Sequence, residues 1–86
     1  MNSLALLEIY ENEKKMVETK VKDLERIDYD YEEDHRGVFL FRLRARLKNK
    51  IFLLAARDYC PETSIRRVFR QLKKLLQKNK VRNELQ

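Results

Sequence analysis

The clearest periodic pattern in the chain is an alternation of apolar and mostly cationic residues between Val38 and Lys48. Because the side chains of a strand point alternately to its two faces, this segment predicts a strand with one face in a core. A second apolar stretch, Ile51 to Arg57, follows a polar link around Asn49. Asn tolerates the left-handed backbone conformation of a tight turn, so the two stretches predict an antiparallel hairpin.

Two segments have the three- and four-residue apolar spacing of an amphipathic helix. The first is Met16 to Ile27, and the second, Ser64 to Lys80, has the longer apolar stripe. Pro61 and the acidic Glu62 precede the second stripe, which suits the start of a helix. We therefore expect one helix on each side of the hairpin.

Two further stretches are less regular. Leu4 to Tyr10 is apolar, but a helical stripe continued backwards from Val17 meets Glu13, so either the helix changes face or a short strand comes first. Ile27 to Asp34 alternates Ile and Tyr with acids, which predicts a short, acidic strand near a sheet edge.

These elements predict one α+β domain over residues 1–86. A small antiparallel sheet carries both helices on one face, because only that arrangement buries the helical stripes together with Phe39, Phe41 and Leu43. The order is α-β-β-β-α, with an extra N-terminal strand as the alternative, and the architecture is like that of double-stranded-RNA-binding domains. We expect residues 81–86 to form a frayed tail.

Charge is divided sharply along the chain. Residues before Arg36 include five cations and eleven acids, whereas residues from Arg36 onward include fifteen cations and three acids. A strongly basic surface attracts polyphosphate and releases condensed counterions on contact. The split therefore favours a nucleic-acid partner, and the residues of the basic half that we expect to contact phosphates are Arg42, Arg44, Arg46, Arg66, Arg67 and Arg70.

Composition argues against several other classes of protein. Cys60 and His35 are the only residues of their types, so no zinc set can form from Cys and His. The chain has no nucleophile with an evident base and no glycine-rich phosphate loop, so we expect no enzymatic activity, cofactor or small-molecule substrate. No apolar run has the length of a membrane span and no secretory signal is evident, which predicts a cytoplasmic protein without a membrane partner.

Two motifs resemble a known family. The run MVETKVKDLERI (Met16 to Ile27) and the run SIRRVFRQLKKLLQKNK (Ser64 to Lys80) are similar to the first and last helices of ribosome hibernation-promoting factors, which have a β-α-β-β-β-α fold. The chain departs from the family in having fewer residues between Ile27 and Phe39, an acidic stretch there, and a longer approach to the last helix. Glu13 also stands where the family helix tends to be apolar.

The resemblance implies binding in the mRNA and tRNA channel of the small ribosomal subunit, which blocks translation without chemistry. The positions that match the family's backbone contacts are Lys20, Lys22, Lys74, Lys78 and Lys80. Cations that contact phosphates position a protein but give little sequence preference, so we expect shape-dependent RNA binding.

Alternatives stay open at this point. The chain could be a DNA-binding regulator, with a homodimer as one option. It could also be a small inhibitor or adapter whose two oppositely charged halves dock on a partner protein or stack head to tail with copies of the chain. The arginines of the central strand could form a merely soluble sheet face. Tyr29 and Tyr31 could stack on bases or be half-buried strand residues. The acids Glu32, Glu33 and Asp34 could compete with RNA for the basic surface.

Overall fold

The computed structural model describes the backbone of residues 3–85 and the side chains of residues 4–78. Its elements, in order, are α1 (Ser3–Lys20), β1 (Leu24–Glu33), β2 (Phe39–Leu47), β3 (Ile51–Asp58) and α2 (Pro61–Leu85). The predicted α-β-β-β-α order is therefore confirmed, and the described residues contain no strand before α1. The tail at 81–86, predicted to fray, lies outside the residues whose side chains are described.

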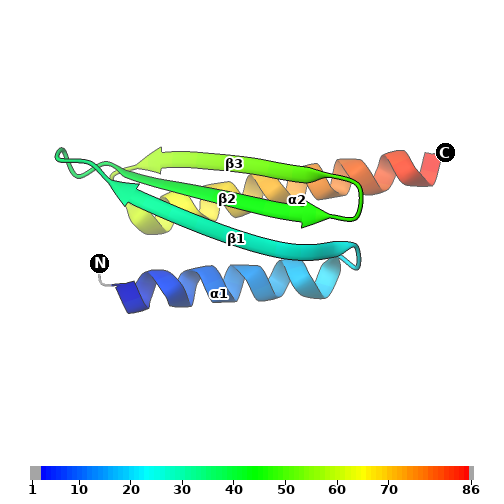
Figure 1. Cartoon of the computed structure of the whole chain (residues 1–86), viewed down its shortest axis with the longest axis horizontal. Coiled ribbons are helices and arrows are strands. Elements are labelled where there is room, and N and C mark those ends of the chain that lie inside the picture. The colour runs from blue at the N-terminus through cyan, green and yellow to red at the C-terminus, as the bar shows by residue number, and fades with distance from the viewer. Residues whose placement is uncertain (1–2, 86) are drawn as a thin grey trace.

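The three strands form one antiparallel sheet in the order β1-β2-β3. Both helices run along this sheet in the same direction, with α1 beside β1 and α2 behind β2 and β3 in the view of Figure 1. The alternation within β2 is complete, because each of its odd-numbered residues is buried and Arg42, Arg44 and Arg46 are exposed. The sheet thus has one face covered by helices and one open face, as predicted.

The core lies between the sheet and the two helices. Phe41 of β2 and Phe69 of α2 are almost fully buried, and the ring of Tyr10 on α1 lies within 6.4 Å and 5.9 Å of their centroids, respectively. Val17 of α1 is also buried. The amphipathic face of α2 buries Ile65, Val68, Phe69, Leu72 and Leu76. Both helices therefore share one core with β2.

The first helix differs from its predicted range. A helix from Met16 to Ile27 was wrong in its second half, because α1 ends at Lys20 and Leu24 begins β1. Leu24 lies opposite Leu47 and Ile27 opposite Ala45. These two residues have helical spacing in the sequence, but they contact the core as part of a strand. Tertiary pairing with β2 overrides the local pattern here.

The apolar stretch Leu4 to Tyr10 belongs to α1, which resolves the choice between helix and strand. Glu13 does lie on the stripe that runs from Tyr10 to Val17. The Glu13 carboxylate is accommodated there because its Oε2 lies 3.2 Å from Nζ of Lys73 on α2. A charged residue on the buried side of a helix is tolerated when it is paired.

The hairpin between β2 and β3 is confirmed, since the amide of Leu47 donates to the carbonyl of Lys50 at 2.8 Å. The expected reason was wrong, however. Among the described residues, only Gly37 has a positive φ, so Asn49 does not use the left-handed conformation.

Candidate nucleic-acid interface

The predicted arginine ladder lies on the open face of the sheet, but it does not lie there alone. The register of β1 against β2 places Asp30 opposite Arg42 and Asp28 opposite Arg44. The Nε of Arg42 donates to Oδ1 of Asp30, and its Nη1 lies 3.7 Å from Glu32. The hydrogen bond and charge of Asp30 raise the pKa of the Arg42 guanidinium above its ordinary value. Arg42 is thus already held by carboxylates.

The other two ladder arginines differ from each other. Arg46 Nε lies 3.8 Å from a carboxylate oxygen of Glu25. Arg44 has no ion pair among the residues whose side chains are described, because Asp28 instead pairs with Arg26 at 2.9 Å. The ladder therefore offers one arginine without an acidic partner in the described part of the chain.

Three parallel rows make up the open face of the sheet. An acidic row on β1 lies beside the arginine row of β2, and an apolar row on β3 follows. An open depression crosses the three strands, lined by Asp28, Asp30, Arg42, Arg44, Leu53 and Ala55. This surface is mixed in charge, so it is not a uniform cationic platform.

The exposed side of α2 carries a different arrangement of cations. Arg66, Arg70, Lys74 and Lys78 follow one another at four-residue spacing and are all exposed. Successive members are separated by about 6 Å along the helix axis. Arg66 pairs with Glu62 at 2.7 Å. Arg70, Lys74 and Lys78, called here the α2 stripe, have no ion pair within residues 4–78, so no described carboxylate pairs with any of the three.

Two further cations of α2 have structural partners. Arg67 lies 3.2 Å from a carboxylate oxygen of Asp58, and its Nη1 donates to the carbonyl of Arg57 at 3.3 Å. Lys73 pairs with Glu13 of α1. These contacts join α2 to β3 and to α1, so they hold the helix that presents the α2 stripe.

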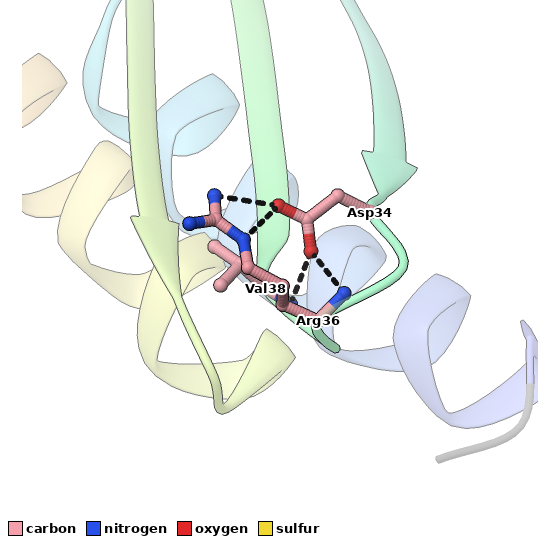
Figure 2. Close-up of polar contacts among 3 residues, drawn as sticks. All are labelled: Asp34, Arg36 and Val38. Atoms are coloured by element: carbon pink, nitrogen blue, oxygen red, sulfur yellow. Dashed lines mark hydrogen bonds and ion pairs between the residues drawn. The ribbon is translucent and has the colours of Figure 1, made fainter.

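Asp34 organises the loop between β1 and β2 (Figure 2). Its carboxylate accepts hydrogen bonds from the amides of Val38 and Arg36 at 3.1 and 2.9 Å and from the Arg36 side chain. The amide bond from Val38, with those from Arg36, lowers the pKa of the Asp34 carboxyl. Gly37 supplies the positive φ of 83° in this turn. Asp34 is therefore part of the loop structure.

The remaining predicted contact residues belong to other elements or lie outside the described side chains. Lys20 ends α1 and Lys22 lies in the link between α1 and β1, and both side chains are exposed. Lys80 lies outside the residues whose side chains are described. Folding thus places Arg70, Lys74 and Lys78 on one line and puts Arg42 and Arg46 among carboxylates.

Tyr29 and Tyr31 lie on the helix-facing side of β1, opposite Leu43 and Phe41. The ring of Tyr29 is 4.1 Å from that of Tyr10, and the ring of Tyr31 is 5.3 Å from that of Phe39. Tyr29 is 36% exposed and Tyr31 is 45% exposed. This geometry favours the interpretation of half-buried strand residues over that of base-stacking platforms.

Cys60 is an exposed thiol just before α2. Hydrogen bonds from the Thr63 side chain and backbone lower its pKa. Within the described residues, no group of three His, Cys, Asp or Glu side chains could hold a metal ion. The helices of the described chain are also too short or too polar to cross a bilayer.

Comparison with known proteins adds a structural relationship but no sequence family. No protein-family model matches the chain, and no curated protein matches it in sequence. Among solved structures, a ribosomal subunit interface protein from Coxiella burnetii superposes with a TM-score of 0.80, covering 92% of this chain and 86% of that chain at 15% identity. The chain therefore has the α+β fold of a ribosomal subunit interface protein, to which its sequence bears only a distant resemblance.

Proposed function

We propose that this chain is a non-enzymatic RNA-binding protein that associates with the ribosome in the cytoplasm and restrains translation. The fold that it shares with a ribosomal subunit interface protein supports the ribosome as partner. The observation that carries the proposal is the α2 stripe, whose three cations are exposed and lack acidic partners in the described chain. RNA backbone is the class of ligand that such a row recognises.

The stripe acts through charge and hydrogen bonds to phosphate oxygens. Steps of about 6 Å along the helix let successive cations reach successive phosphates of one RNA strand. Contacts of this type fix position and orientation, so shape and not sequence selects the site. In this proposal Arg44, Arg66, Lys20, Lys22 and Lys80 add positive charge outside the stripe, and Arg67 mainly orients α2.

Arg42 and Arg46 have a smaller role in this proposal. An RNA phosphate approaching Arg42 must compete with Asp30 and Glu32, which already neutralise that guanidinium. Acids close to a phosphate also repel it. The strand ladder therefore contributes less affinity per cation than the α2 stripe.

Co-sedimentation with purified small ribosomal subunits across a salt series tests the proposal. The key variant is Arg70→Gln/Lys74→Gln/Lys78→Gln, and its matched control is Arg42→Gln/Arg44→Gln/Arg46→Gln, which removes the same charge. We expect the α2 triple to reduce the slope of log affinity against log salt by about 2 and the sheet triple to reduce it by less. Circular dichroism melting confirms that both fold.

Three outcomes would contradict the proposal in different ways. Retention of the α2 triple at the wild-type level removes the stripe from the mechanism. Equal displacement by duplex DNA, duplex RNA and subunits at fixed salt indicates a non-specific polyanion binder, and preference for duplex DNA indicates a DNA-binding regulator.

The mixed open face favours one second candidate, a protein-docking adapter. Adjacent acidic, arginine and apolar rows suit a polar protein surface better than a phosphate backbone. Loss of subunit binding in the sheet triple, with the α2 triple unaffected and ribosomal RNA alone not bound, would favour this candidate.

A further inference from the structure

The two outer edges of the sheet differ in how they are protected. On the β1 edge, Asp28, Asp30 and Glu32 alternate along the strand. On the β3 edge, Ile51 to Ala56 is uncharged, and 71% of Leu53 and 56% of Ile51 are exposed. Charge on an edge strand discourages pairing with another chain, and an apolar edge without charge invites it. The β3 edge is therefore a candidate contact surface.

The hairpin register shows which backbone groups of β3 point outward. In an antiparallel pair, hydrogen-bonded and non-hydrogen-bonded residue pairs alternate along the strands. Because Leu47 and Lys50 form a hydrogen-bonded pair, the residues of β3 whose backbone groups hydrogen-bond to β2 are Phe52, Leu54 and Ala56. The residues between them direct their amides and carbonyls away from β2, to the outer edge. These are Ile51, Leu53, Ala55 and Arg57.

One of these outward groups is already occupied. The carbonyl of Arg57 accepts a hydrogen bond from Nη1 of Arg67 at 3.3 Å, because α2 passes beside the end of β3. This contact closes the outer edge at its C-terminal end. The available ladder then runs from Ile51 to Ala55, and Leu53 lies at its centre.

We propose that the β3 edges of two copies of this chain pair antiparallel about a two-fold axis at Leu53, which joins the two sheets into one of six strands. The contact surface of a two-fold pair must be self-complementary, and an antiparallel ladder centred on Leu53 meets this condition. It places Leu53 beside the partner's Leu53 and Ile51 beside the partner's Ala55. No like charges oppose each other between Ile51 and Ala55, and the most exposed aliphatic side chain of β3 is covered by its own copy.

The expected dimer is weak. Three residues per copy supply about six backbone hydrogen bonds, and an edge-to-edge contact of this length is below the size of a stable interface. Both α2 helices lie on the same side of the joined sheet, so their positive charges repel each other. Dimerisation should therefore strengthen with salt, whereas binding to ribosomal RNA weakens with salt.

Cysteine crosslinking in a Cys60→Ser background tests the register. In a hydrogen-bonded antiparallel pair the Cα atoms are about 5.5 Å apart, which a disulfide can span, so Leu53→Cys should form a covalent dimer on oxidation. Ile51→Cys is the matched control, because the two copies of residue 51 lie about 13 Å apart along the strands. Ile51→Cys/Ala55→Cys should crosslink again. Equal crosslinking of Leu53→Cys and Ile51→Cys overturns the register.

Sedimentation velocity over a concentration series tests the dimer without crosslinks. Leu53→Lys puts two cations face to face at the axis and should weaken association at least ten-fold. Tyr59→Lys makes the same charge change at a residue that is 75% exposed outside β3 and should leave association unchanged. A wild-type chain that stays monomeric at all concentrations and salts, or an equal effect of the two variants, overturns the proposal. Ribosome retention of Leu53→Lys reports separately on the proposed function.

Discussion

The carboxylate of Glu13 on α1 lies 3.2 Å from the ammonium group of Lys73 on α2, and the pair joins the two helices through residues that are sixty positions apart in sequence. The Glu13 side chain is only 19% exposed and that of Lys73 is 38% exposed. A partly buried pair is screened less by solvent than a surface pair. The contact therefore fixes α1 against the helix that carries the α2 stripe.

A double-mutant cycle on this pair should give a measurable coupling. We expect Glu13→Gln and Lys73→Gln each to destabilise the fold, with a coupling free energy of about 1 kcal/mol in urea unfolding at low salt. The i,i+4 pair Lys14 and Glu18, whose atoms are 3.9 Å apart, lies within one helix and is the control, and it should show less coupling. A coupling for Glu13 and Lys73 no larger than for the control would show that the contact does not join the helices energetically.

The hydroxyl group and the ring of Tyr10 should make separate contributions to the free energy of unfolding. Its hydroxyl donates to the carbonyl of Ile27 at 3.3 Å inside the core. We expect Tyr10→Phe to cost about 1 kcal/mol and Tyr10→Ala about 4 kcal/mol of unfolding free energy. Chemical denaturation measures both, and equal losses would mean that the ring itself contributes little.

Alkaline pH should weaken the fold through the same residue. Burial raises the pKa of Tyr10 well above its ordinary value of 10.0, so the folded chain keeps a proton that the unfolded chain loses. The stabilisation is complete below pH 10 and declines as the pH rises above it. Tyr10→Phe should flatten this part of the stability profile, measured by urea unfolding between pH 8 and 11.

Asp34 should make the fold sensitive to acid. Hydrogen bonds from the Val38 and Arg36 amides lower its pKa below the ordinary 3.8. Since the unfolded chain then binds a proton more readily, stability is present above that value and falls as the pH drops through the lowered pKa. Asp34→Asn should remove this component of acid unfolding, and an unchanged acid profile would show that the loop contacts are not coupled to folding.

Neutralising the acids of β1 should strengthen RNA binding through the sheet. Asp30→Asn/Glu32→Gln leaves Arg42 without its two carboxylates, so its charge becomes available to phosphate. We expect the affinity for small subunits to rise several-fold at low salt, and the control Glu11→Gln/Glu18→Gln, on the exposed surface of α1, to change it less. Filter binding or co-sedimentation checks this, and equal gains would point to net charge alone.

The alternation in β2 and the apolar stripe of α2 could be predicted because both depend on local periodicity. Apolar residues with a period of two indicate a half-buried strand, and apolar residues with a period near 3.6 indicate an amphipathic helix, whichever elements pack against them. The boundary between α1 and β1 could not be predicted in the same way. Leu24 fits a helical stripe after Val17 and Val21, and only its pairing with Leu47 assigns it to a strand.

The candidate site shows the same division. The amino-acid sequence by itself determined the α+β order, the face of β2 that bears arginines and the line of cations on α2, because these follow from spacing within one element. Only the tertiary structure decided that Asp30 lies opposite Arg42 and that Lys73 forms an ion pair with Glu13. Pairs between different strands or helices depend on strand register and helix packing, which spacing within one element does not specify. The sequence therefore determined how many cations the basic half of the chain carries. Folding decided how many of those cations are paired with carboxylates and how many remain accessible to a partner.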